Sequence, residues 1–90
     1  MSAMSNLATG DRSATRAEVL AARTALRQLA GRHGLSHPRV DATGTVIVHS
    51  SDPGYAALMS YADAAAKTIG VWVNVITDDA PAAQVDSDEL

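Results

Sequence analysis

The side chains that could carry acid–base chemistry are few, and most stand where a carboxylate has a structural use. General acid–base catalysis needs two positioned carboxylates or a histidine with a partner. Glu18 follows Thr15 by three residues, as in a helix capping box. Asp41 begins a turn, and Asp52 precedes a proline at a position suited to a helix N-cap. We therefore predict no catalytic residue and a protein that is not an enzyme.

Two histidines, His33 and His37, are four residues apart, a spacing that places two metal ligands on one face of a continuous helix. Gly34 and Pro38 interrupt that helix, and no third ligand follows at an obvious position. The chain has no cysteine, which excludes thiolate catalysis, disulfides and cysteine-based zinc sites. No glycine-rich phosphate loop is present. The sequence therefore predicts neither a metal nor a cofactor.

Four arginines have a spacing that suggests a common surface. Arg12, Arg16, Arg23 and Arg27 are separated by 4, 7 and 4 residues, which aligns them along one stripe of a helix. Such a stripe is either a solvated flank whose aliphatic stems cover the edge of the core, or a binding face for an anionic partner. We treat the four as candidate partner-binding residues.

Charge is divided unevenly along the chain. Residues 1–40 hold six arginines against two acids, a balance of +4, whereas residues 41–90 hold one lysine against eight acids, a balance of −7. This asymmetry suits either an acidic tail that folds over a basic face or a basic face reserved for an acidic partner. The candidate partner-binding acids near the end of the sequence are Asp78, Asp79, Asp86, Asp88 and Glu89.

The elements that must position these residues follow from hydrophobic periodicity and turn residues. Apolar residues at three- and four-residue intervals predict the helices, β-branched runs predict the strands, and Gly34, Gly44 and Gly70 mark their ends. The expected elements are a helix at about 15–33, strands near 38–41 and 45–50, a helix at about 53–69 and a strand at 71–77. The strand–helix–strand succession should place its two strands parallel. The predicted fold is α/β (α+β), α-β-β-α-β, with a three-stranded mixed sheet and two packed helices.

The domain organisation follows from composition. Residues 1–13 are polar and lack an apolar period, so we expect a flexible segment, followed by a single α/β domain over 14–77. Residues 78–90 are acidic and aperiodic, and we expect a disordered tail. The start of the chain is too polar for a signal peptide, and no apolar run approaches the roughly 20 residues of a membrane span. We therefore expect a cytoplasmic protein without a membrane partner.

The phrase LRQLAGRHGLSHPRV, followed by a β-branched strand, a helix and VWVNVITDD, resembles the minimal nucleotidyltransferase (MNT) family. The resemblance covers about residues 20–78 and implies the same α-β-β-α-β order. Small domains of that family are often encoded as antitoxins beside HEPN-type toxins, so the resemblance also implies a protein partner.

The positions that carry the family's chemistry differ in this chain. Its Gly-Ser motif is replaced by Asp41-Ala42-Thr43, its Asp-x-Asp strand by residues 45–49, and its last-strand aspartate by Asn74. Two-metal nucleotidyl transfer needs carboxylates to hold Mg²⁺ against a triphosphate. The resemblance therefore implies a pseudoenzyme.

Three functions are compatible with these observations. The leading hypothesis is a non-catalytic protein-interaction domain, antitoxin-like or regulatory, that binds a protein partner or a second copy through the arginine stripe and the acidic tail. A small DNA-binding transcriptional regulator that uses the arginine stripe is the first alternative, although the net charge of −3 disfavours nucleic acid. A structural subunit of a larger assembly is the second, with the alanine-rich second helix as a packing face.

Overall fold

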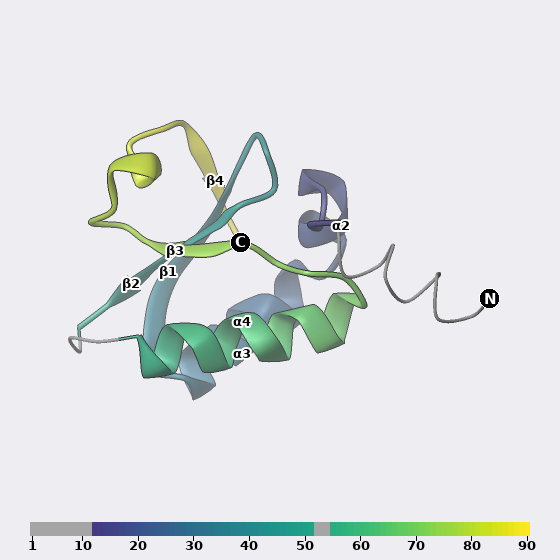
Figure 1. The fold of residues 1–90 in the computed structure, drawn as a ribbon, viewed down its shortest axis with the longest axis horizontal. Coiled ribbons are helices and arrows are strands. Elements are labelled where there is room, and N and C mark those ends of the chain that lie inside the picture. The colour runs from purple at the N-terminus through teal and green to yellow at the C-terminus, as the bar shows by residue number, and fades with distance from the viewer. Residues whose placement is uncertain (1–11, 52–54) are drawn as a thin grey trace.

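The computed structural model describes residues 12–51 and 55–90. These residues form three α-helices and a four-stranded mixed sheet, with α3 and α4 side by side on one face of the sheet (Figure 1). The mixed α+β class is confirmed, whereas the expected count of three strands is wrong. The elements are α2 (Arg16–Ala21), α3 (Arg23–Arg32), β1 (Leu35–Asp41), β2 (Val46–Ser50), α4 (Ala56–Ile69), β3 (Val75–Thr77), the 3-10 helix η1 (Pro81–Ala83) and β4 (Ser87–Glu89).

The first predicted helix is present but interrupted. Its capping box is confirmed: the Glu18 N–H donates to Thr15 Oγ1 at 3.2 Å, and the Thr15 N–H donates to Glu18 Oε1 at 2.9 Å. At Ala22 the backbone leaves helical geometry, with ψ of 14°, so the expected single helix becomes α2 and α3. Gly34, with φ of +72°, then turns the chain into β1 in a conformation that glycine adopts without steric cost.

The predicted hairpin is confirmed, with β1 and β2 antiparallel. β1 begins at Leu35, earlier than the expected start at residue 38, because Leu35 and Ser36 also pair with β2. The register shifts between Ser36 and Arg39, where His37 takes a φ of +54°. This bulge accommodates Pro38, which has no N–H to donate to a regular ladder.

The second predicted helix and the last strand are present in shorter form. α4 ends at Gly70, whose φ of +93° fits the predicted glycine stop. The expected helix start, including the Asp52 cap, lies outside the described residues. Only Val75–Thr77 of the predicted 71–77 strand pairs with β2, and it does so in parallel, as expected of a strand–helix–strand unit. The strand is shorter because Trp72 makes a single β-bridge to Ser13 and not to β2.

The prediction of a disordered tail over 78–90 is wrong. This segment forms η1 and β4, and β4 pairs antiparallel with β1 to give the strand order β3-β2-β1-β4. The following residue, Leu90, is only 4% exposed. A strand that composition did not indicate therefore forms because it docks on the edge of the hairpin.

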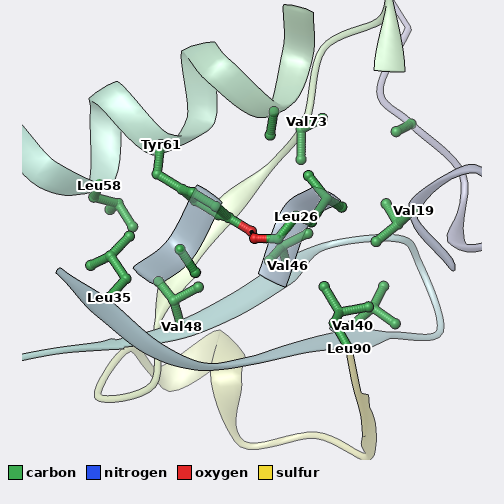
Figure 2. Packing of buried hydrophobic residues seen from close by; sticks show 13 residues of the cluster. Val19, Leu26, Leu35, Val40, Val46, Val48, Leu58, Tyr61, Val73 and Leu90 are labelled. Atoms are coloured by element: carbon green, nitrogen blue, oxygen red, sulfur yellow. Dashed lines mark hydrogen bonds between the residues drawn. The ribbon is translucent and has the colours of Figure 1, made fainter. Parts of the chain in front are cut away.

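The main core lies between the sheet and the helices. Figure 2 shows Val46 and Val48 of β2 facing Leu26 and Tyr61. The Tyr61 hydroxyl donates to the Leu26 carbonyl at 3.0 Å, and burial raises the pKa of this phenol to about 12.

The opposite face of the sheet is covered by the connection from β3 to β4. Ile47 alternates with its neighbours in β2 and points to this face, yet it is fully buried. The connection contains the buried Ala83 and runs below β2 in Figure 2. Within residues 12–51 and 55–90, none of the helices has the length and hydropathy that crossing a bilayer requires.

Candidate protein-binding surfaces

Three of the four arginines of the stripe lie on α2 and α3, and these three contact the segment Ser87–Leu90. Arg16 forms an ion pair with the Asp88 carboxylate. Arg23 Nη2 donates to the Glu89 carbonyl and Arg27 Nη1 to the main-chain oxygen of Leu90, each at 3.1 Å. Of the two arrangements that the charge asymmetry allowed, the structure shows the acidic segment folded over the basic face of the same chain.

The predicted acidic residues do not form one surface. Asp88 lies on the helix side with Arg16, whereas Glu89 follows it on the other face as the register partner of Arg39. Asp78 pairs with His49, and Asp79 accepts a hydrogen bond from the Thr77 hydroxyl. Asp86 is exposed on the connection to β4.

Arg12 lies before α2 and extends the capping box. Its guanidinium donates to both carboxylate oxygens of Glu18, at 2.6 and 3.0 Å. These bonds, together with the Thr15 N–H, lower the pKa of Glu18 from 4.5 to about 2. Arg12 therefore has a structural partner, Glu18, in the first turn of α2.

The Glu18 pKa shift predicts a pH dependence. A carboxylate whose pKa is lower in the folded state contributes its stability fully above pH 4.5 and loses it as the pH falls towards 2. We expect the difference in unfolding free energy between wild type and Glu18→Gln to be constant above pH 5 and to shrink below pH 4. Urea unfolding at each pH measures this difference. A difference that stays constant down to pH 2 would contradict the assignment.

Asp41, Thr45 and Asn74 meet in space around the hairpin turn. Asp41 Oδ1 accepts from the Thr43 N–H, the Thr43 hydroxyl and the Thr45 N–H, at 2.7–3.0 Å. Burial alone would raise the pKa of Asp41, but these hydrogen bonds outweigh it and lower the pKa. Asn74 Nδ2 donates to the Thr45 hydroxyl at 3.1 Å. The carboxylate and the amide therefore hold the turn and join it to the chain entering β3.

The histidines are distributed over two places. His33 packs edge-on against Tyr61, with ring centroids 6.2 Å apart, whereas His37 lies near His49. His49 Nδ1 is 3.0 Å from Asp78 Oδ2, and both side chains are exposed. Across the described part of the chain, no group of three histidine or acidic residues could hold a metal ion.

A groove between α4 and β3 is lined by two of the exposed large apolar residues, Met59 and Trp72. It has a volume of about 310 Å³. Met59 is 60% exposed and Trp72 is 55% exposed, although both are large apolar residues. The groove is lined by Met59, Ala62, Asp63, Ala66, Trp72, Val73, Asn74 and Val75.

The groove adjoins an open edge of the sheet. β3 is an end strand, and the described residues place no further strand against it. The Asn74 carbonyl and the Asp78 N–H point towards β2. Because alternate residues of a strand direct their backbone groups to opposite sides, those of Val75 face the open edge. A backbone edge and an apolar groove therefore form one continuous surface.

Sequence reasoning missed this groove because hydrophobic periodicity predicts helices and strands but not which of their apolar side chains the rest of the fold leaves exposed. One signal was present: Trp72 is the only tryptophan in the chain, and it interrupts a run of small β-branched residues. Tryptophan and methionine are enriched at binding surfaces.

Comparisons with known proteins add no relative. No protein-family model, curated protein or solved structure matches this chain. The functional proposal therefore stands on the chain's own sequence and contacts.

Proposed function

We propose that this chain is a non-catalytic protein-interaction domain that acts in the cytoplasm as an antitoxin-like or regulatory protein, with a degenerate nucleotidyltransferase-like fold. The observation that carries the proposal is the groove between α4 and β3. A small domain has little stability, and exposed apolar side chains such as Trp72 and Met59 contribute little to it. A partner that buries these two side chains would therefore stabilise the chain.

The partner segment that fits this surface is extended and apolar on alternate residues. Its backbone pairs with the open edge of β3, as in β-strand addition, and its apolar side chains enter the groove beside Trp72. The exposed Asp63–Lys67 ion pair gives the groove a polar rim.

The absence of a catalytic role is supported by the structural use of the carboxylates. Glu18 completes a helix cap, and Asp41 directs one oxygen to three donors within its turn. Asp41 stands where the resembled family has its Gly-Ser motif, so the turn takes the place of a nucleotide-binding loop.

The test uses the protein encoded by the neighbouring gene, coexpressed with this chain. We expect Trp72→Ala to weaken the complex by at least about tenfold, because buried tryptophans are frequent interface hot spots. Val85→Ala serves as the control, since Val85 is 50% exposed on the connection to β4 and does not line the groove. Isothermal titration measures both affinities, and the fluorescence of Trp72 reports whether the groove is covered.

Two results would contradict the proposal. Equal affinity of the wild-type and Trp72→Ala chains would remove the groove from the interface. Metal-dependent transfer of a nucleotide to the partner by this chain would show that it is an enzyme.

A further inference from the structure

β4 pairs with only part of the outer edge of β1. β1 runs from Leu35 to Asp41, but the ladder with β4 spans only Arg39 to Asp41. The Leu90 N–H extends the contact to the Pro38 carbonyl at 2.9 Å. The remaining edge, residues 35–37, faces no strand in the part of the chain that the structure describes. An extended segment longer than β4 could therefore pair with more of β1.

The arginine stripe holds β4 largely through groups that every peptide has. Arg23 and Arg27 each bind a main-chain oxygen, so these two contacts do not depend on the side chains of the segment. Selectivity comes from two positions, the Asp88 carboxylate at Arg16 and the buried Leu90 side chain. The site thus holds an extended segment in which an acid is followed two residues later by an apolar residue.

β4 fits this site imperfectly. The Ser87 hydroxyl oxygen is buried and finds no hydrogen-bond partner among residues 12–51 and 55–90, which costs stability. Cavities of about 320 and 380 Å³ adjoin the segment. The first lies beside Arg27 and Leu90, and the second beside Arg16 and Ser87. A segment with larger side chains at these places would make contacts that β4 lacks.

We propose that the outer edge of β1, with Arg16, Arg23 and Arg27, is a binding site for an extended acidic segment of a partner protein, and that β4 is its built-in competitor. The site lies at the opposite end of the sheet from the α4–β3 groove, so it is independent of the function proposed above. An outside segment displaces only residues 87–90. A second copy is the less suitable occupant, because exchange would also detach the connection whose Ala83 is buried.

The probe is a fluorescent synthetic peptide with this chain's own sequence from Gln84 to Leu90, titrated into the full chain and followed by anisotropy. In the full chain the attached β4 competes, so its weakening should strengthen peptide binding. We expect Asp88→Asn in the chain to tighten the apparent affinity about two- to fivefold, the range for one exposed ion pair. Arg16→Gln added to the Asp88→Asn chain should weaken binding of the same peptide, because the attached β4 then has no carboxylate to lose at Arg16 whereas the peptide keeps its own.

The two chain variants change surface residues on opposite sides of one contact, so a general loss of stability cannot produce opposite effects. A peptide of scrambled sequence is the control and should not bind. Equal affinity of the wild-type and Asp88→Asn chains would overturn the competitor role of β4. Peptide affinity that Arg16→Gln leaves unchanged in the Asp88→Asn chain would overturn the site. Dimers that form with rising concentration and exclude the peptide would overturn the assignment to an outside partner.

Discussion

Replacing Gly44 by alanine is expected to destabilise the fold by about 3 kcal/mol or more. Gly44 has a φ of +91°, a region that costs an L-residue steric strain. A Cβ atom there would lie 2.5 Å from the Ala14 carbonyl oxygen and 2.9 Å from the Arg16 nitrogen. Both neighbours are backbone atoms, so the clash cannot be relieved by rotating a side chain. The turn would have to move away from the start of α2.

The control is Gly31→Ala in α3. Gly31 lies in a helix, and a Cβ added there meets no atom within 4 Å. This variant should be stabilised by up to about 1 kcal/mol, since alanine is the better helix former. Urea unfolding of both variants measures the difference. A Gly44→Ala chain as stable as wild type would show that the turn does not pack against α2.

Local chemistry predicted the elements whose signals lie within a few neighbouring residues. The capping box of Thr15 and Glu18 depends on a spacing of three, and both of its hydrogen bonds are present. The hairpin depends on a turn that begins at Asp41 and ends at Gly44 between β-branched residues, and it forms as expected. Sequence could also predict that Gly44 ends the turn. It could not show that the turn abuts Ala14, because that contact depends on tertiary packing.

β4 shows where local reasoning fails. The residues Ser87, Asp88 and Glu89 have low strand propensity and no apolar alternation, so they read as a solvated tail. They form a strand because β1 has an unpaired edge and Arg16 pairs with the Asp88 carboxylate. Tertiary contacts thus override propensity, as they also do at Ala22, where no glycine or proline marks the interruption of the helix.

The candidate site was predictable in its charges but not in its arrangement. The spacing of the arginines and the acidity of residues 78–90 are evident from the sequence. They are compatible with two arrangements, in which the basic face binds either the acidic segment of the same chain or an acidic partner. Choosing between them required the register that places Asp88 opposite Val40, on the face of the sheet that Arg16 reaches. The α4–β3 groove could not be predicted from the sequence, because the exposure of Trp72 depends on how the other elements pack around it.

Truncating Leu90 to alanine should lower the free energy of unfolding by about 2–3 kcal/mol, the lower part of the range for a buried leucine. Leu90 is 4% exposed and packs in the main cluster with Val40, as Figure 2 shows. A disordered tail would make the same substitution neutral, so the variant separates the sequence-based expectation from the structure. A small core supplies roughly 3–5 kcal/mol in total, which makes this loss a large fraction of the stability.

The matched control for Leu90→Ala is Val85→Ala, five residues earlier and 50% exposed, which should stay within about 0.5 kcal/mol of wild type. Chemical unfolding measures both changes. Hydrogen exchange adds a local measurement, because the Leu90 N–H donates to the Pro38 carbonyl and should exchange slowly in the wild-type chain. Fast exchange of that amide, or a neutral Leu90→Ala variant, would show that β4 does not stay docked. Slow exchange with a large loss of stability would establish β4 as part of the fold that a competing segment must displace.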